Sequence, residues 1–544
     1  MSIGLSDSVP TRDRPSRWAP LAIFVITAVW VVTLSVDRAL VWDEGMTLER
    51  LDLMDEGIGK LFRGEIGLST FADRYWRFSR AEPDGHGPFY ALLSNLGHHL
   101  SRRFVLPPLS YRLGPILFFS FAVAVLFQSL RRHLSLVGRL TMVSLLIMMP
   151  RLLPEVSFAL IDGPLASLSM LAFASFWSAI DRGSLAWSAC WGMVIGAAMA
   201  TKLTGWFLPI PYIVWLASTF LSSSRGWKYQ QIVLAFVAML ASLLLLNVGW
   251  WPDPIGGLQG YFQSNLTRRD TIPIPILFLG KRYDFSLPWY NTLVWSVVAL
   301  PVGTVVMGGV GALWSIVTCR WDRFARLTLA CWLLVIILRS LPQAPGHDGT
   351  RQIIVSFVFL AVLAGLAVDR LGKALSFHRL GWIVPPLLAL SAAGESMSSV
   401  IKYHPLELSY YSPVVGGLPG AERIGFEPTY FWDSVTTDVR DWLRRETPAG
   451  MSVLFRNYTP SWKYLFDWNQ IPEYFSPGSP PPRWFVLQHR PGQYDDVDRE
   501  ILARAKPVFQ KEWMGVPLLS IFDINDWYQA RQRVGTMARG ATSP

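Results

Sequence analysis

Long apolar runs recur every ~20 to 35 residues up to about residue 400, and the chain beyond that point mixes apolar and polar residues. A helix needs about 20 apolar residues to cross the hydrocarbon core of a membrane. The pattern therefore predicts a polytopic α-helical membrane protein followed by a water-soluble domain. We place the crossings near residues 18–36, 109–130, 137–153, 158–180, 186–203, 205–221, 229–250, 290–317, 325–341, 351–368 and 379–398.

One further apolar stretch, 87–101, decides the topology. It is short, and it carries His98, His99, Arg102 and Arg103 at its end. If this stretch does not cross, the chain has about 11 crossings, and nearly every short basic loop lies on the same side as the N-terminus, in the cytoplasm. If it crosses, those basic loops lie outside. We therefore prefer an interfacial or half-buried helix at 87–101.

The topology divides the chain into three parts within the inner or plasma membrane of the cell. Residues 1–17 form a cytoplasmic tail, residues 18–399 a transmembrane domain with a long external loop at 37–108, and residues 400–544 an extracytoplasmic domain. Apolar residues at 46–62 have partly helical spacing, which suits a helix on the membrane surface. In the C-terminal domain we predict helices at 436–446 and 496–505 and strands near 451–456, 483–489 and 517–523, which together indicate a small α/β domain.

Charge and cysteine content fit this arrangement. Only 16% of residues are charged, against roughly 25% in soluble proteins. The net charge of 49 − 39 = +10 comes from basic residues that cluster in short loops between apolar runs, as membrane topology requires. No basic and aromatic binding module is present, so we expect membrane lipid and no nucleic acid as a partner. The three cysteines lie in or beside apolar segments, which excludes a disulfide framework.

Ionisable residues gather at the predicted outer ends of the spans, where charge is costly and needs a reason. Each has a structural explanation when taken alone: a solvated loop, a buried ion pair, or a long side chain that reaches back to the interface. The set comprises Asp43 and Glu44 after the first crossing, Arg112 at the second, Asp162 at the fourth, Lys202 at the end of the fifth, and His347, Asp348 and Arg351 at the tenth.

Taken together, these residues suit one reaction. A carboxylate can accept the proton of an acceptor hydroxyl, and lysine or arginine can hold a departing phosphate whose charge grows in the transition state. Carboxylates beside cations at a membrane surface therefore predict group transfer from a lipid phosphate.

The order of the motifs strengthens this interpretation. They are Trp42-Asp43-Glu44, Gly85-His86-Gly87-Pro88-Phe89-Tyr90, Tyr111-Arg112-Leu113, Ile161-Asp162-Gly163-Pro164, Thr201-Lys202-Leu203-Thr204-Gly205, Pro288-Trp289-Tyr290 and His347-Asp348-Gly349-Thr350-Arg351. Their order and spacing resemble the C-type (GT-C) glycosyltransferases, namely the bacterial family-39-like members of the protein O-mannosyltransferase and aminoarabinose-transferase superfamily. The resemblance spans about residues 20–430. Gly87, Phe89 and Gln352 depart from it, standing where the family usually has proline, leucine and histidine.

The resemblance implies a GT-C-like fold and an inverting transfer of a sugar from a polyprenyl-phosphate donor to an acceptor hydroxyl at the outer membrane face. It makes Asp43 the base and Glu44 a helper or ligand-positioning group, and it brings Asp162 near the donor and Lys202 and Arg351 near the lipid phosphate. His86, Arg112, His347 and Asp348 complete the expected donor-binding set. The sugar and the acceptor, whether protein, lipid or glycan, stay open. So does a divalent metal near Asp43, Glu44 and Asp162, because a few carboxylates without defined geometry are a weak signal.

Two other functions compete with this one. A lipid or solute transporter or flippase tends to have inverted repeats and charges near the bilayer middle. The sequence has no clear repeat, and its charges lie at the outer ends of the spans, which favours the transferase. A non-catalytic membrane scaffold of the same fold is the other alternative.

Overall fold

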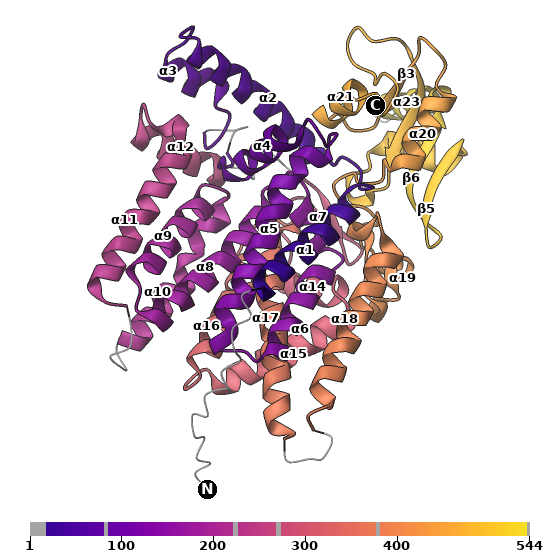
Figure 1. Ribbon diagram of the computed structural model, residues 1–544. Helices are drawn as coiled ribbons and strands as arrows, with labels where there is room; N and C mark the ends of the chain where they lie inside the picture. The colour runs from indigo at the N-terminus through magenta and orange to yellow at the C-terminus, as the bar shows by residue number, and fades with distance from the viewer. Residues whose placement is uncertain (1–17, 81–84, 221–226, 268–273, 377–380, 541–544) are drawn as a thin grey trace.

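The computed structural model describes residues 18–80, 85–220, 227–267, 274–376 and 381–540. It has a body of long helices with a smaller mixed domain at one end (Figure 1). The helices of the body are α1 (Ala19–Ser35), α5 (Leu109–Ser129), α6 (Leu136–Met148), α8 (Asp162–Arg182), α9 (Leu185–Met199), α10 (Pro209–Phe220), α11 (Tyr229–Leu246), α14 (Asn291–Val298), α15 (Val302–Thr318), α16 (Arg323–Ser340), α17 (Ile354–Ala374) and α18 (Val384–Tyr403).

Each predicted crossing contains helix within the described residues, and residues 221, 379 and 380 at the ends of two crossings lie outside them. The stretch 290–317 is divided into α14 and α15 at Pro301, whose missing N–H interrupts the helical hydrogen bonds. In the described part of the chain, the stretches long and apolar enough to cross a membrane alone are Leu109–Arg132, Asp162–Arg182, Tyr229–Leu246 and Arg351–Ala374, and shorter apolar helices accompany them. The helical architecture is therefore confirmed, while the number of crossings stays a prediction.

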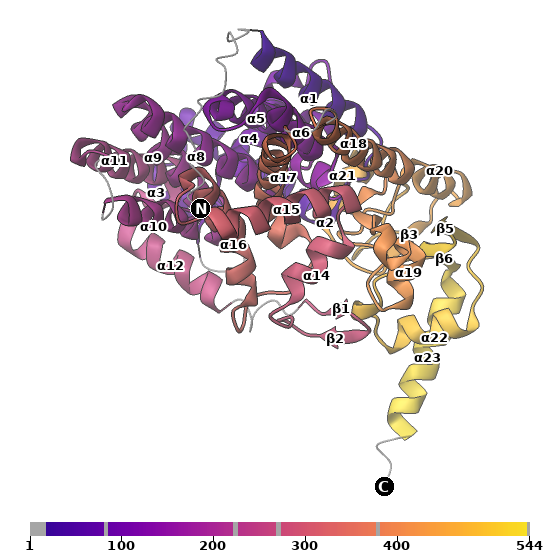
Figure 2. The same cartoon turned by 90° about the horizontal axis from the view of Figure 1, so that it is seen from below.

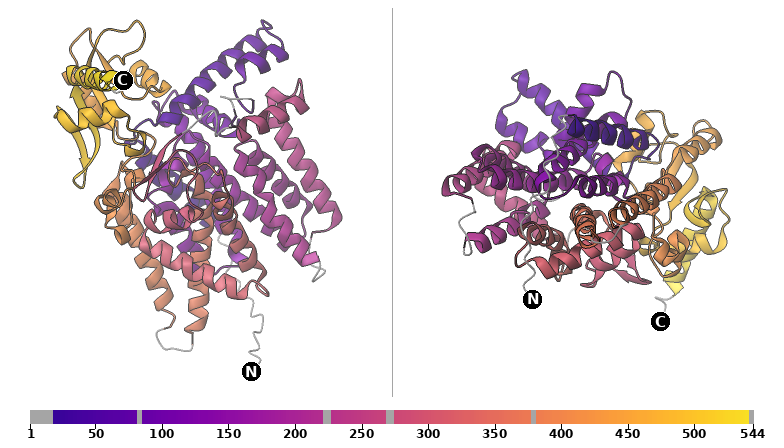
Figure 3. Two further views of the ribbon diagram at one scale, coloured as in Figure 1. Left: turned by 180° about the vertical axis from the view of Figure 1, so that it is seen from behind. Right: turned by 60° about the horizontal axis from the view of Figure 1, so that its bottom comes forward.

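Burial separates the helices at the centre of the body from those at its edge. The most apolar window of α8 is 94% buried and that of the helix beginning at Arg351 is 89% buried, against 17% for α11. Helix α11 packs closely on α9, because a Cβ atom on Gly192 would lie 2.0 Å from the carbonyl oxygen of Ala235. Small residues let membrane helices approach in this way without a hydrophobic driving force. In Figures 1 and 3, α9, α10 and α11 stand on one side of the body and α14, α15 and α18 on the other.

Short elements cover the end of the body that carries the mixed domain. They are α2 (Trp42–Phe62), α3 (Leu68–Thr70), η1 (Phe71–Tyr75), α4 (Phe89–Ser101), α7 (Leu152–Ser157), η4 (Val248–Trp250), α12 (Pro254–Leu266) and the hairpin β1 (Ile276–Phe278) and β2 (Lys281–Tyr283). Helix α4 matches the stretch 87–101 and has 13 residues, the same length as α6 of the body, so its placement as a helix that does not cross stays a prediction. The helix predicted at 46–62 begins earlier, at Trp42, and its placement on the membrane surface stays a prediction.

The C-terminal part forms an α/β unit around a four-stranded sheet of order β3-β4-β6-β5. Strands β3 (Ser452–Phe455) and β4 (Pro482–Gln488) are parallel, and β6 (Val516–Asp523) pairs antiparallel with both β4 and β5 (Phe509–Trp513). The helices are α20 (Thr437–Glu446), α21 (Pro460–Asp467), α22 (Asp496–Arg504) and α23 (Ile524–Gly540), the last of which extends away from the body (Figure 2). All five predicted elements are present, and β5, α21 and α23 were not predicted.

A connecting segment joins the two parts. After α18, residues 404–435 contain α19 (Gly417–Arg423) and the short turns η6 (Glu407–Ser409) and η7 (Pro413–Val415). Leu406, Tyr410, Leu418, Phe426 and Tyr430 belong to the same apolar core as the long helices. This segment therefore packs with the helical body. The division of the chain at residue 400 stays a prediction.

Candidate active site

Three of the predicted residues meet at the end of the body nearest the C-terminal domain. Asp43 lies in the first turn of α2, Asp162 begins α8, and Arg351 begins the short turn η5 (Arg351–Ile353) that leads into α17. The Nη1 atom of Arg351 lies 2.5 Å from Oδ2 of Asp43, and its Nε lies 2.5 Å from Oδ2 of Asp162. The side chain of Asp43 is 33% exposed, whereas the other two are buried. Asp43 is therefore the member that a ligand can reach.

Lys202, Gln352 and His347 extend this cluster behind Arg351. Lys202 follows α9 and donates to Asp162 Oδ1 at 2.7 Å and to Gln352 Oε1 at 3.3 Å. The amide nitrogen of Gln352 lies 3.1 Å from Nε2 of His347. Gln352 stands where the resembled family often has histidine, and its amide can accept from Lys202 and donate to His347 at once. Gln352, although it departs from the family pattern, therefore links Lys202 to His347.

Helix direction brings these residues to one side. Helix α8 and the turn η5 begin at the cluster, whereas α9 ends just before Lys202, and the turn η3 (Leu203–Phe207) follows. Antiparallel neighbours bring the start of one helix beside the end of another. Asp162, Lys202 and Arg351 therefore meet although they are far apart in sequence. The cluster contains Asp43, Asp162, Lys202, His347, Asp348 and Arg351 from the predicted set.

Glu44 and Arg112 form a separate buried pair. Arg112 donates to Glu44 at 2.6 and 2.8 Å and to the carbonyl oxygens of Ser35, Arg38 and Ala39 at 2.7 to 3.1 Å. Glu44 also accepts the backbone N–H of Val41, so its carboxylate caps the start of α2. Both side chains are at most 1% exposed. The pair fixes the segment that leads into Asp43 and does not face the Arg351 cluster.

His86 lies in a segment bound to the loop that carries Lys202. Its carbonyl accepts from the N–H of Ser79 at 2.7 Å, and the N–H of Gly87 donates to Thr201 at 3.2 Å. A Cβ atom on Gly87 would lie 2.1 Å from the carbonyl oxygen of Ala200. Proline in this position would add that clash and remove the donor. The glycine that departs from the family pattern is therefore required by this backbone contact.

Two aromatic residues of the connecting segment complete the wall of the cluster. The guanidinium carbon of Arg351 lies 4.5 Å from the ring centre of Phe431, and the rings of Trp42 and Trp432 lie 4.6 Å apart. The N–H of Trp42 donates to the carbonyl of Phe431 at 3.1 Å. Phe431 and Trp432 both have φ of 56°, a left-handed conformation that bulky residues adopt at an energetic cost. Such strain is typical of functional sites. No local motif in the sequence indicated these two residues.

Arg490, which follows strand β4, is a further residue that the motifs did not indicate. It lies 3.4 Å from Oδ1 of Asp348 and 3.2 Å from Glu427, and all three side chains are buried. Burial opposes its charged form, but Glu427 and then Asp348 raise the pKa of Arg490 above its ordinary value. Asp348 in turn lies 3.4 Å from Arg351. A chain of alternating charges therefore links the C-terminal unit to Asp43.

The carboxylates of this site face cations. Asp43 and Asp162 both point at Arg351, and Asp162 also binds Lys202. Within the described ranges, no group of three or more histidine, cysteine, aspartate or glutamate side chains could hold a metal ion. This arrangement does not fit a divalent cation, and the mechanism proposed below includes none.

Sequence comparison finds no matching family model and no matching curated protein. Solved structures with similar folds do exist. The crystal structure of ArnT from Cupriavidus metallidurans bound to undecaprenyl phosphate has a TM-score of 0.52 and 14% identity, covering 93% of this chain and 98% of that one. The apo crystal structure of the same enzyme has a TM-score of 0.50 and 15% identity, covering 92% and 97%.

These similarities extend over almost the whole of both chains, from the helical body into the C-terminal unit. At 14–15% identity they establish the fold. Together with the apolar helices, they show a multi-pass membrane protein. The fold expected from the motifs is therefore confirmed, and this chain has the GT-C fold of membrane glycosyltransferases.

Proposed function

We propose that this protein is an inverting glycosyltransferase that moves a sugar from a polyprenyl-phosphate donor to an acceptor hydroxyl at the outer face of the cell membrane. The observation that carries this proposal is Arg351, which joins the exposed Asp43 to the buried Asp162 beside Lys202. A carboxylate and two cations at one end of a GT-C fold suit phosphate departure and proton removal. The solved enzyme of similar fold is bound to undecaprenyl phosphate, which supports a donor of this class.

In the proposed reaction, the acceptor oxygen attacks the anomeric carbon of the donor sugar while Asp43 accepts the hydroxyl proton. The bond between the anomeric carbon and the phosphate oxygen breaks, and polyprenyl phosphate leaves with the bonding electrons. Attack opposite the leaving group inverts the anomeric configuration. Arg351 and Lys202 stabilise the phosphate as its negative charge increases.

Both cations are already paired in the structure, which has a consequence for donor binding. Arg351 is neutralised by Asp43 and Asp162, and Lys202 by Asp162. A donor phosphate must therefore compete with Asp43 for the Nη atoms of Arg351. Its binding would release the Asp43 carboxylate toward the acceptor hydroxyl, so that the base is freed only when the donor is in place. Glu44 supports Asp43 by holding the start of α2.

The orientation follows from the same proposal. The charged cluster and the C-terminal unit lie at the same end of the helical body (Figure 1). With the N-terminus in the cytoplasm, this end lies outside, where a lipid-linked sugar carried across the membrane is available. The acceptor is a hydroxyl of a protein, lipid or glycan.

The experiment is sugar transfer by the purified full-length protein in liposomes, with a panel of polyprenyl-phosphate sugars and mass spectrometry of the products. Asp43→Asn keeps the side-chain shape, and Glu49→Gln is a matched control because Glu49 is an exposed carboxylate on the same helix α2. Loss of a general base should lower the rate about 100-fold or more. Equal transfer or donor hydrolysis by wild type and Asp43→Asn would remove Asp43 as the base. A matching loss in Glu49→Gln would show a general effect on α2.

A further inference from the structure

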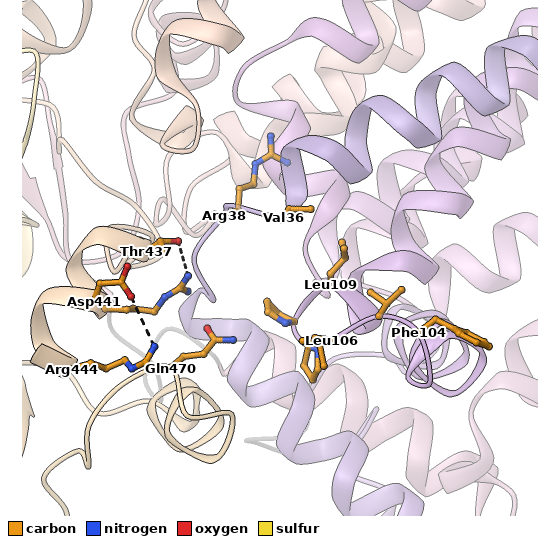
Figure 4. A pocket seen from close by; sticks show the side chains of 13 residues that line it. Val36, Arg38, Phe104, Leu106, Leu109, Thr437, Asp441, Arg444 and Gln470 are labelled. Atoms are coloured by element: carbon orange, nitrogen blue, oxygen red, sulfur yellow. Dashed lines mark hydrogen bonds and ion pairs between the residues drawn. The ribbon is translucent and has the colours of Figure 1, made fainter.

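A pocket of about 560 Å³ lies between the C-terminal unit and the helical body, apart from the Arg351 cluster. Figure 4 shows it between helix α20 and the segment that carries Phe104 and Leu106. Its volume is within the range of small-molecule sites. The side chain of Arg38 turns away from Thr437 and Asp441 and donates to Glu407 at 2.7 Å. The arginines available to an occupant are therefore those of α20.

One face of α20 lines this pocket. Thr437, Arg440, Asp441 and Arg444 have the spacing i, i+3, i+4, i+7, which aligns their side chains on one face of a helix. The Nη2 atom of Arg440 donates to the hydroxyl of Thr437 at 2.9 Å, and Asp441, Asp438 and Asp37 act on this arginine only through space among the described residues. Arg444 has only a long contact of 4.0 Å with Asp441. Two arginines and one aspartate leave this face with a positive charge.

Arg440 is half-buried, so a bound anion would favour its charged form. Burial, followed by repulsion from Arg112, lowers the pKa of Arg440 below its ordinary value. A bound anion would offset both effects. The first turn of α20 also opens on the pocket at Thr437, and the partial positive charge of a helix start favours an anion there.

The opposite wall is apolar and lies at the ends of α1 and α5, two helices that we predict to cross the membrane. Phe104 is 87% exposed and Leu106 is 82% exposed, although both are large apolar residues. They stand just before α5, which begins at Leu109, and Val36 stands just after α1, which ends at Ser35. Two membrane helices therefore end at this pocket. Exposed apolar side chains beside arginines at the ends of membrane helices are typical of the boundary between acyl chains and headgroups.

The geometry points to a binding site for an anionic phospholipid, whose phosphate contacts Arg440 and Arg444 while an acyl chain lies along Phe104 and Leu106. The charge of the α20 face matches the phosphate, and the apolar wall matches the chain. The site does not depend on sugar transfer, because it shares no residue with the Arg351 cluster. Its occupant would hold the C-terminal unit against the membrane through α20.

Native mass spectrometry of the full-length protein tests this site with phosphatidylglycerol and phosphatidylcholine added separately at equal concentration. Wild type should retain phosphatidylglycerol preferentially, and Arg440→Gln/Arg444→Gln should lose about tenfold in apparent affinity for it. Arg445→Gln is the matched control, because Arg445 lies on the same helix, pairs with Glu446 and does not line the pocket. A photoactivatable phosphatidylglycerol should label the segment 104–109.

Each alternative result would overturn the lipid site. Equal retention of both lipids, or no loss in the double variant, would remove the role of the arginines. Displacement of phosphatidylglycerol by millimolar inorganic phosphate would show that the pocket binds the free anion. Phe104→Ser/Leu106→Ser tests the apolar wall separately. These side chains are exposed, so the change should keep the fold and lower phosphatidylglycerol retention, and unchanged retention would contradict the proposal.

Discussion

Arg490 of the C-terminal unit lies 3.4 Å from Asp348, which in turn lies 3.4 Å from Arg351. Arg490 is separated from Asp348 by 142 residues, yet both are buried in the same network. The C-terminal unit is therefore in direct contact with the charges around Asp43.

We expect Arg490→Gln to lower sugar transfer about tenfold, because Asp348 would then draw Arg351 away from Asp43. Removing one partner of a buried pair also destabilises, so transfer is measured together with thermal unfolding. Arg490→Gln/Asp348→Asn removes the pull of Asp348 on Arg351, so transfer should recover, whereas Glu427 stays buried without its charged partner and stability should stay low. Arg499→Gln, at an exposed arginine of α22, is the control. Transfer that stays low together with stability in the double variant would assign Arg490 a purely structural role.

Substitutions of the adjacent carboxylates Asp43 and Glu44 should affect stability differently. Glu44→Gln leaves Arg112 buried without its charged partner, and we expect it to lower the free energy of unfolding by about 3–5 kcal/mol. Asp43→Asn should leave thermal stability nearly unchanged, because its side chain is partly exposed. Differential scanning fluorimetry of both proteins in one lipid composition measures the difference. Similar melting temperatures would contradict the structural assignment of Glu44.

The stability of the protein should depend on pH through Asp433. Burial raises the pKa of Asp433 to about 7 and outweighs the opposing effects of its own backbone N–H and of Ser434. The folded state then binds a proton that the unfolded state has released, so stability falls as pH rises from about 4 to about 7. This shift corresponds to about 4 kcal/mol. Asp433→Asn should raise the melting temperature at pH 8 and have little effect at pH 4. An equal change at both values would exclude this titration.

Glu407, the buried partner of Arg38, should make stability depend on pH in the opposite direction. The opposing burial is outweighed by Arg38 and His404, which lower the pKa of Glu407 to about 2. An acid with a lowered pKa contributes stability above its unfolded pKa, and this contribution is lost as pH falls toward 2. Glu407→Gln should therefore destabilise at pH 7 and differ less from wild type near pH 3. Melting curves across this range measure it, and a constant difference would contradict the assignment.

The close approach at Gly87 predicts a steric effect. Gly87→Ala places a methyl group against the backbone of Ala200, and we expect a loss of about 1–3 kcal/mol together with a displaced Lys202 loop. Gly309→Ala is the control, because nothing lies within 4 Å of its Cβ position and α15 accepts alanine there. Thermal unfolding of both variants makes the comparison. If Gly87→Ala melts like Gly309→Ala, the contact is not tight.

The sequence indicated which charged residues belong to the candidate site, but it did not indicate the directions in which their side chains point. Asp162, Lys202 and Arg351 were identifiable because charges at the ends of apolar runs need partners. The sequence did not predict that Asp43 and Glu44 lie in separate positions. Successive helical residues point about 100° apart, and the predicted helix at 46–62 began after both residues. Phe431, Trp432 and Arg490 come from distant segments without motifs.

In the fold, the long apolar helices were predictable because membrane crossing imposes their length. Strand β5 was not, because it is an edge strand whose central residues Gln510, Lys511 and Glu512 are polar. Helix α23 is polar over most of its length and contains no long apolar run. The division of α14 from α15 could have been read from Pro301.

The contacts at the start of α2 also bear on the order in which the molecule is completed during synthesis. Ser461 donates to the carbonyl of Val41 at 2.8 Å, and Thr459 donates to that of Trp42 at 3.1 Å, across 420 and 417 residues of chain. The backbone around Asp43 therefore leaves the ribosome long before Thr459 and Ser461, the residues that bind it. A chain synthesised only up to residue 458 therefore carries Asp43 without these two contacts to the start of α2.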